Sequence, residues 1–333
     1  MSEKSFPVLK YLHLPTLGGV RGMQPSQITV PNLTQLRVNY HCAGAILDSA
    51  PLHLFSKLTT LELNVFRYKQ QSQRDRFVSI LHSASATLEV LILRRGQFDP
   101  TSGSGSASLE LMPTIFPRLT FLVLDAIVEY CDSAHSIVGE LCRAAHVLER
   151  LHIVRYFPSR VHAYLHSGSL CFPTVRFLRY FVPDQADWDK FIPGHTDWHN
   201  FIYAFPCLEE LQISGGDPTP MIHAAVAMDV AAKGGNGSPA WPRLANLALF
   251  GAHEAIAIRF VQHRAAAGHP LSVVAYEGWL LIRTERIFAD LNVTFVPLNR
   301  WPANGDDYDE DWVEYWHIIN GTLPFRRRPA VTS

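Results

Sequence analysis

The chain has 333 residues, of which 47% are hydrophobic and 18% are charged. This balance supports a large buried core and excludes a chain that is disordered throughout. The formal net charge is -1, from 29 basic and 30 acidic residues, so no basic excess points to nucleic acid or to an anionic membrane surface.

Cysteine usage and the opening residues indicate a cellular compartment. The five cysteines are widely spaced and form no CxxC pair, which favours reduced thiols and an intracellular protein. The opening stretch MSEKSFPVLKYLHL lacks the basic and then apolar run of a secretory signal, and no segment approaches the ~20 apolar residues that span a bilayer. We therefore expect a cytoplasmic or nuclear protein without a membrane partner.

The first predicted element is a strand motif, FPVLKYLHL from Phe6, and close copies of it recur along the chain. Each copy contains L-x-x-L-x-L or a near relative, often after an aromatic-proline pair. Successive copies start about 24 to 36 residues apart, which is the range of solenoid repeats. The clearest copies open at Leu9, Leu33, Leu58, Leu119, Leu208 and Leu244, and weaker ones open at Leu88, Leu148 and Val175.

The motif has a physical basis in strand geometry. Its last two leucines are two residues apart, so both face one side of a strand while their neighbours face the other side. The preceding proline has no N–H to donate and stops the helix before it. One such unit cannot bury its apolar face alone, but stacked units share a continuous core beneath a parallel sheet.

Segments with helical periodicity separate the motifs. They are Ser72–Ser85, Asp132–Ala145 and Ala252–Ala267, the last ending at Gly268. Alternating strands and helices predict right-handed crossovers, and hence an α/β fold: an irregular leucine-rich-repeat-like solenoid with a curved parallel sheet and helices on its convex side. A set of ordinary βαβ units in a doubly wound sheet is the alternative.

Loops and tails interrupt this pattern. Asp99–Pro113 and Ala231–Ala240 are rich in glycine and serine and are predicted to be surface loops. The aromatic stretch from Pro183 is predicted to hold a helix in its second half, with Trp188, Phe191, Trp198 and Phe201 available for packing. We assign residues 1–300 to the solenoid and 301–333 to an acidic loop followed by a basic, disordered tail.

Two groups of residues could in principle carry chemistry. Cys142 and His146 are four apart on a predicted helix and could form a thiolate–imidazole pair, but a packed cysteine beside a surface histidine is the favoured interpretation. His195, Asp197 and His199 could ligate zinc, but no paired metal motif accompanies them, and a loop or helix start is favoured. We therefore expect neither enzymatic activity nor a cofactor or metal.

The strand motifs and the late block WPRLANLALFGAHEAIAIRFVQHRAAAGHPLSVVAYEG resemble the leucine-rich-repeat halves of fungal F-box proteins, over about Phe6 to Val296. The resemblance implies an arc of repeats that captures a protein substrate. It also implies a ubiquitin-ligase adaptor as a partner, bound by a separate F-box module.

Two features depart from that family. No F-box is visible, because HLPTLGGVRGM lacks the leucine-proline-x-glutamate start, so we expect an adaptor partner only if an F-box exists outside this sequence. The position that holds a ladder asparagine in regular repeats holds Leu17, His41, Phe66 or Gly96, which predicts irregular contacts between repeats.

A binding surface is predicted from the strand positions on either side of the second leucine, which face the concave side. These positions are polar at both ends of the row and apolar in the middle, at Val90, Ile92, Phe121 and Val123. Either this surface is exposed or a long loop covers it. The predicted partner-binding residues are Arg37, Glu62, Ile92, Phe121, Val123, Arg150, His152, Phe177, Arg179 and Gln212.

These observations predict a protein-interaction scaffold, the substrate-recognition part of an F-box-type receptor, with an unknown protein as its partner and no nucleic acid. Two alternatives remain. One is a stand-alone structural or regulatory repeat protein unconnected to ubiquitin. The other is an α/β enzyme that uses the Cys142 pair or the His195 segment.

Overall fold

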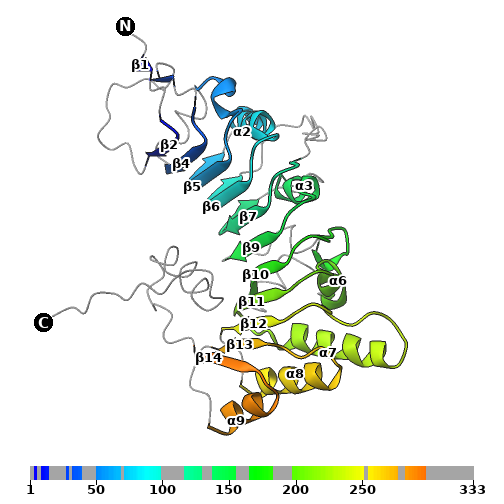
Figure 1. The fold of residues 1–333 in the computed structure, drawn as a ribbon. Coiled ribbons are helices and arrows are strands. Elements are labelled where there is room, and N and C mark those ends of the chain that lie inside the picture. Colours follow the sequence, from blue (N-terminus) through cyan, green and yellow to red (C-terminus); the bar gives the residue numbers. More distant parts are fainter. Residues whose placement is uncertain are drawn as a thin grey trace, which may run out of the picture.

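Figure 1 shows the computed structural model of the chain, in which successive strands lie side by side along one long sheet. The residues that the structure describes are 4–5, 9–14, 28–29, 32–39, 50–68, 71–98, 116–129, 137–154, 165–182, 197–250, 254–276 and 282–297. The predicted loop at Asp99–Pro113 and the segment 301–333 lie outside them.

The main sheet is parallel, and its strands follow one another in chain order. It runs through β2 (Tyr11–Leu14), β4 (Gln35–Asn39), β5 (Thr60–Tyr68), β6 (Val90–Phe98), β7 (Phe121–Asp125), β9 (Arg150–Val154), β10 (Phe177–Val182), β11 (Glu210–Gly215), β12 (Asn246–Leu249), β13 (Val273–Tyr276) and β14 (Thr294–Pro297). β8 (Val128–Glu129) pairs with β6, while β1 (Lys4–Ser5) and β3 (Ile28–Thr29) form a separate parallel pair. A doubly wound sheet requires a reversal of strand order, and the described strands show none.

The register is uniform along the main sheet. Leu61 of β5, for example, aligns with Leu36 of β4 on one side and with Leu91 of β6 on the other. From Lys10 before β2 to Ala245 before β12, the backbone carbonyl just before the strand accepts two N–H groups from the next motif; Thr34 O, for example, accepts from Thr59 at 2.7 Å and from Thr60 at 3.1 Å. These backbone bonds align successive motifs at the entry to the described strands without a ladder asparagine.

The leucines of the motif build the core, as their alternation predicts. The opening leucine or valine of each described motif from Leu33 to Leu244 is buried, and so are the two inward positions of the strands that follow. Burying one such side chain contributes about 1.5–3 kcal/mol, so each motif depends on its neighbours for stability. The inward pairs include Leu36 and Val38, Leu61 and Leu63, Leu91 and Leu93, Leu122 and Leu124, Leu151 and Ile153, Leu178 and Tyr180, Leu211 and Ile213, and Leu247 and Leu249.

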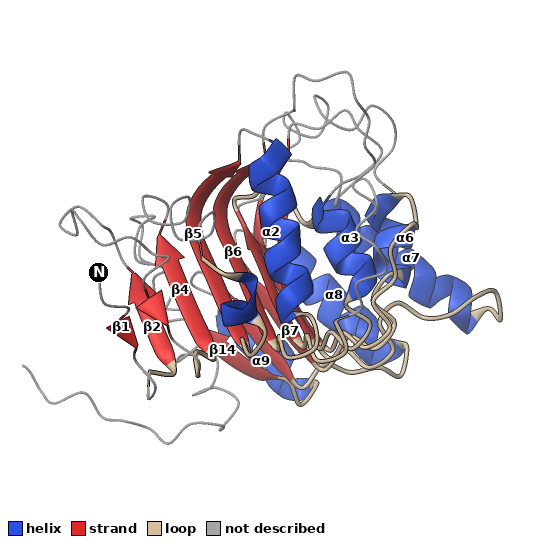
Figure 2. Ribbon diagram, turned by 90° about the horizontal axis from the view of Figure 1, so that it is seen from above, coloured by secondary structure: helices blue, strands red, loops and turns tan. Residues whose placement is uncertain are grey.

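The described helices lie to one side of the sheet in Figure 2. The larger ones are α2 (Gln71–Ala84), α3 (Ile137–Ala144), α6 (Trp198–Tyr203), α7 (Thr219–Lys233), α8 (Glu254–Ala266) and α9 (Ile282–Asp290), and a 3-10 turn, η2, spans Leu52–Phe55. None of these is long and apolar enough to cross a bilayer.

The helix predictions are confirmed where the structure describes them, with one correction. α2 and α8 match the predicted segments closely, and α6 buries Trp198 and Phe201 in the second half of the insertion, as predicted. Residues 132–136, 188 and 191 lie outside the described part of the chain. The loop predicted at Ala231–Ala240 begins later, because the alanines that end α7 are strong helix formers and the helix stops only before Gly234.

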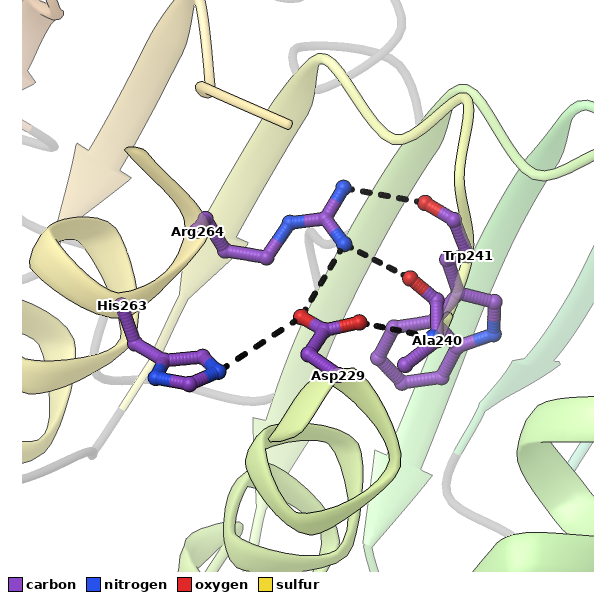
Figure 3. Close-up of polar contacts among 5 residues, drawn as sticks. All are labelled: Asp229, Ala240, Trp241, His263 and Arg264. Atoms are coloured by element: carbon purple, nitrogen blue, oxygen red, sulfur yellow. Dashed lines mark hydrogen bonds and ion pairs between the residues drawn. The ribbon is translucent and has the colours of Figure 1, made fainter. Parts of the chain in front are cut away.

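A buried ionic contact joins α7, α8 and the entry to β12 (Figure 3). Arg264 is 0% exposed and donates from Nη1 to the Ala240 carbonyl at 2.6 Å and from Nη2 to the Trp241 carbonyl at 3.0 Å. Its Nη1 also lies 3.4 Å from Oδ2 of Asp229, whose Oδ1 accepts the Ala240 N–H at 2.8 Å. Burial lowers the pKa of Arg264 from its ordinary value, and Asp229 opposes that shift.

The same contact holds an unfavourable backbone conformation. Trp241 has a φ of 41°, which is in the left-handed region and costs a bulky residue of order 1–3 kcal/mol. Its side chain is fully buried and its carbonyl is bound by Arg264. The buried guanidinium therefore fixes the turn that leads into β12.

We predict that Arg264→Met destabilises the fold by about 3–5 kcal/mol, because it removes the guanidinium that pairs with the buried Asp229 carboxylate and leaves two carbonyls without their donor. Asp229 would keep only the Ala240 N–H and the His263 ring, whose Nε2 lies 4.0 Å away. Urea denaturation followed by circular dichroism measures the change.

Arg259→Met is the control for that experiment, since Arg259 is exposed on the same helix. We expect its unfolding free energy to stay within about 0.5 kcal/mol of the wild-type value. Equal losses from the two substitutions would show that the buried contact has no special role.

Candidate partner-binding surface

The face of the sheet opposite the leucine core, here called the open face, carries the predicted binding residues. Because side chains alternate along each strand, the neighbours of the buried leucines point to this face. The parallel register then sets equivalent positions side by side. One row across seven strands is Arg37, Glu62, Ile92, Val123, His152, Arg179 and Gln212, and the row beside it includes Phe121, Arg150 and Phe177.

The first third of the open face is linked by ion pairs. Glu62 forms ion pairs with both flanking strands, with Oε1 at 3.2 Å from Nε of Arg37 and 3.6 Å from Nε of Arg94. Asn64 donates to the same oxygen at 3.1 Å. Sequence reasoning missed Arg94, because it considered only two positions per strand and β6 continues beyond them. This region therefore neutralises much of its own charge.

The middle of the open face holds the arginine–aromatic cluster, which comprises Phe121, Arg150, His152, Phe177 and Arg179. The His152 ring lies 4.9 Å from the Phe121 ring in an edge-on contact and 5.1 Å from the Phe177 ring. In register, Arg150 is flanked by Phe121 and Phe177, while Arg179 aligns with His152. The fold thus brings together five of the predicted residues from three neighbouring strands.

The electrostatics of the cluster keep its histidine neutral. Burial is the largest cause that lowers the pKa of His152 well below its ordinary value, and the positive charges of Arg179, Arg94 and Arg150 lower it further. The imidazole is therefore uncharged at neutral pH. The positive charge of this region belongs to its arginines, and the ring serves as an aromatic spacer between the two phenylalanines.

Two of the predicted binding residues are poorly placed to contact a partner. Val123 is 5% exposed and Gln212 is 2% exposed. Val123 lies between Ile92 and His152 in its row, and Gln212 lies between Arg179 and Ala248, so the flanking strands bracket both side chains. The accessible part of the predicted apolar stretch is accordingly smaller than the sequence suggests, with Val90, Ile92 and Phe121 only partly exposed.

The last third of the open face holds a small apolar cluster that sequence reasoning missed. Ala248, Phe250 and Ala275 are buried there, and Phe177 and Val296 pack against them. Alanines and a valine at outward strand positions carry no distinctive signal in a single sequence. Because the three central members are buried, this cluster adds little accessible surface.

The residues proposed for chemistry are not assembled into a site where the structure describes them. Cys142 is 4% exposed on α3, whereas His146 follows the end of that helix and is exposed. Asp197 caps α6 by accepting from the backbone N–H groups of His199 and Asn200, and His195 lies outside the described residues. Within the described ranges, no three His, Cys, Asp or Glu side chains are grouped so that they could hold a metal ion.

A second buried histidine, His166, ties the segment before β10 to α6. Its Nδ1–H donates to the Asp197 carbonyl at 3.1 Å, and Asn200 Nδ2 donates to the His166 carbonyl at 2.8 Å. The ring packs edge-on against Trp198 at 4.8 Å. Burial lowers the pKa of His166 to about 4, although the Asp197 carbonyl opposes the shift.

Comparison with known proteins adds no assignment to this geometry. No model of a known protein family matches the chain, and no curated protein matches it. A function must therefore be inferred from the open face and from the pattern of the strands.

We predict that His166 makes the fold less stable in acid. Its pKa is about 4 in the folded chain and about 6.5 unfolded, so the unfolded state gains a proton first and stability is lost as the pH falls from about 6.5 towards 4. The contribution is ~2.5 kcal/mol between pH 7 and pH 4.5. The unfolding free energy is measured by urea denaturation at pH 7 and at pH 4.5. Between these two pH values, it should fall by ~2.5 kcal/mol less in His166→Gln than in the wild-type chain.

His146→Gln is the matched control, because His146 is exposed. We expect this variant to keep the wild-type dependence on pH. If the unfolding free energy of His166→Gln depended on pH as that of the wild-type chain does, the low pKa of His166 would not be the cause of the loss of stability in acid.

Proposed function

We propose that this protein is a protein-interaction scaffold, an irregular leucine-rich-repeat-like solenoid that binds a protein partner on a concave open face. One observation carries the proposal: the two faces of the same strands have opposite characters. Buried apolar residues of the motifs, most of them leucines, occupy one face, whereas the other presents arginines and aromatic rings in aligned rows. Arginine and aromatic residues are enriched at the energetic centres of protein interfaces.

The proposal extends to a role as the substrate-recognition part of an F-box-type ubiquitin-ligase receptor. The resemblance of the strand motifs and of the block from Trp241 supports this extension. The adaptor would bind through an F-box outside this sequence, and the chain itself would contribute no catalytic group. The alternative, a stand-alone regulatory repeat protein, uses the same open face. Co-purification of the ligase adaptor with the chain from cells separates the two.

We predict that the combined change Phe121→Ala and Arg179→Glu abolishes binding to at least one partner that the wild-type chain retains. The substitutions remove an aromatic contact and reverse a charge on neighbouring strands of the open face. Cross-linking in cells, followed by affinity purification and mass spectrometry, measures the loss.

Arg118→Glu provides the control, because it makes the same charge change at an exposed turn just before β7, away from the rows of the open face. We expect this variant to retain all partners. If the folded double variant keeps every partner, the open face is not the binding surface.

A further inference from the structure

Arg150 is the most accessible charged group of the arginine–aromatic cluster. It is exposed, while Phe121 and Phe177 on either side of it are half-buried and anchored by the His152 ring. Among the described residues, no acidic side chain lies within ion-pair distance of Arg150. Its position therefore differs from that of Arg37 and Arg94, which both engage Glu62.

The cluster is positive and also has aromatic surfaces that contact one another through the His152 ring. Three positive charges lie close to the His152 ring, because those of Arg179, Arg94 and Arg150 each lower the pKa of that ring. A guanidinium is planar and weakly hydrated, so it binds a carboxylate through two parallel hydrogen bonds, and it does so best beside groups that exclude water. The two phenylalanines provide such groups one strand away on each side.

We propose that the arginine–aromatic cluster binds an acidic segment of a partner protein, with a carboxylate on Arg150 and an adjacent apolar or aromatic side chain on the rings of Phe121 and Phe177. This inference rests on the proposed function and specifies the chemistry of its partner. Adjacent strands are about 4.8 Å apart, so a segment that crosses β7, β9 and β10 needs only about three extended residues.

A peptide fits the cluster better than nucleic acid does. A strand of nucleic acid needs a continuous row of cations, whereas the chain has a net charge of -1 and the positive area is local. Glu62 lies in the same row on one side of the cluster, and Glu210 follows Phe177 in the neighbouring row on the other. These carboxylates would repel a phosphate backbone that continued past the arginines.

The test uses a short fluorescein-labelled peptide of alternating aspartate and tyrosine, and fluorescence anisotropy with the full chain. We expect the peptide to bind, and we expect Asn-for-Asp and Ser-for-Tyr versions to bind at least tenfold more weakly. Arg150→Glu should weaken binding at least tenfold, and raising the salt concentration should also weaken it, because the contact is between partly exposed charges. Arg118→Glu should bind the peptide as the wild-type chain does.

Several results would overturn the proposal. They are equal binding of a Lys-for-Asp peptide, wild-type affinity in Arg150→Glu, and tighter binding of a single-stranded oligonucleotide than of the peptide. The peptide could also bind only after the acidic residues within 306–311 are changed to their amides. That result would show that the cluster binds the chain's own acidic segment and not a partner.

The test also distinguishes this inference from the function on which it rests. If no peptide binds, but the Phe121 and Arg179 double variant still loses its cellular partner, only the acidic chemistry is wrong. If the double variant keeps every partner and the aspartate–tyrosine peptide does not bind, both proposals fail.

Discussion

The fold depends on a backbone ladder at the entry to the strands. Before each strand, a single carbonyl accepts the N–H groups of two consecutive residues in the next motif, and this repeats from Lys10 to Ala245. Thr34, Thr59 and Thr120 add side-chain bonds to the preceding carbonyls at the same level. Because the bonds belong to the backbone, any residue except proline, which has no N–H, can occupy the donor positions. The sequence pattern of the motif is therefore confined mainly to its leucines. The strands align uniformly although the motifs carry no ladder asparagine.

A fixed register determines what the open face can present. A slip of one residue would exchange the two faces of a strand, so the leucine core and the open-face rows are specified together. Phe121, His152 and Phe177 come from three separate motifs, yet their rings lie within contact distance because the ladder keeps their strands level. The cluster is a consequence of the core, since the same alternation that buries Leu151 and Ile153 turns Arg150 and His152 outward.

The sequence predicted the parts of the structure that depend on local pattern. Parallel strands, α2, α8 and the residues of the open face all follow from periodicity. Contacts between distant segments were not predictable in this way. Asp229 and Arg264 are 35 residues apart on different helices, and nothing in either segment marks the pair. The low exposure of Val123 and Gln212 likewise depends on the side chains of the strands beside them, which a single strand motif does not specify.

The contrast between two arginines connects stability with function. Arg264 is fully buried, and its bonds to Asp229, Ala240 and Trp241 hold a strained turn in place. Removing a charge from water is costly, so a buried guanidinium persists only where such acceptors compensate it. Arg150 needs no internal acceptor because water solvates it, and its hydrogen-bonding groups remain accessible beside two anchored rings. The same type of side chain thus stabilises the fold where it is buried between helices, at Arg264, and is accessible on the open face of the sheet, at Arg150, where we propose that it binds a partner.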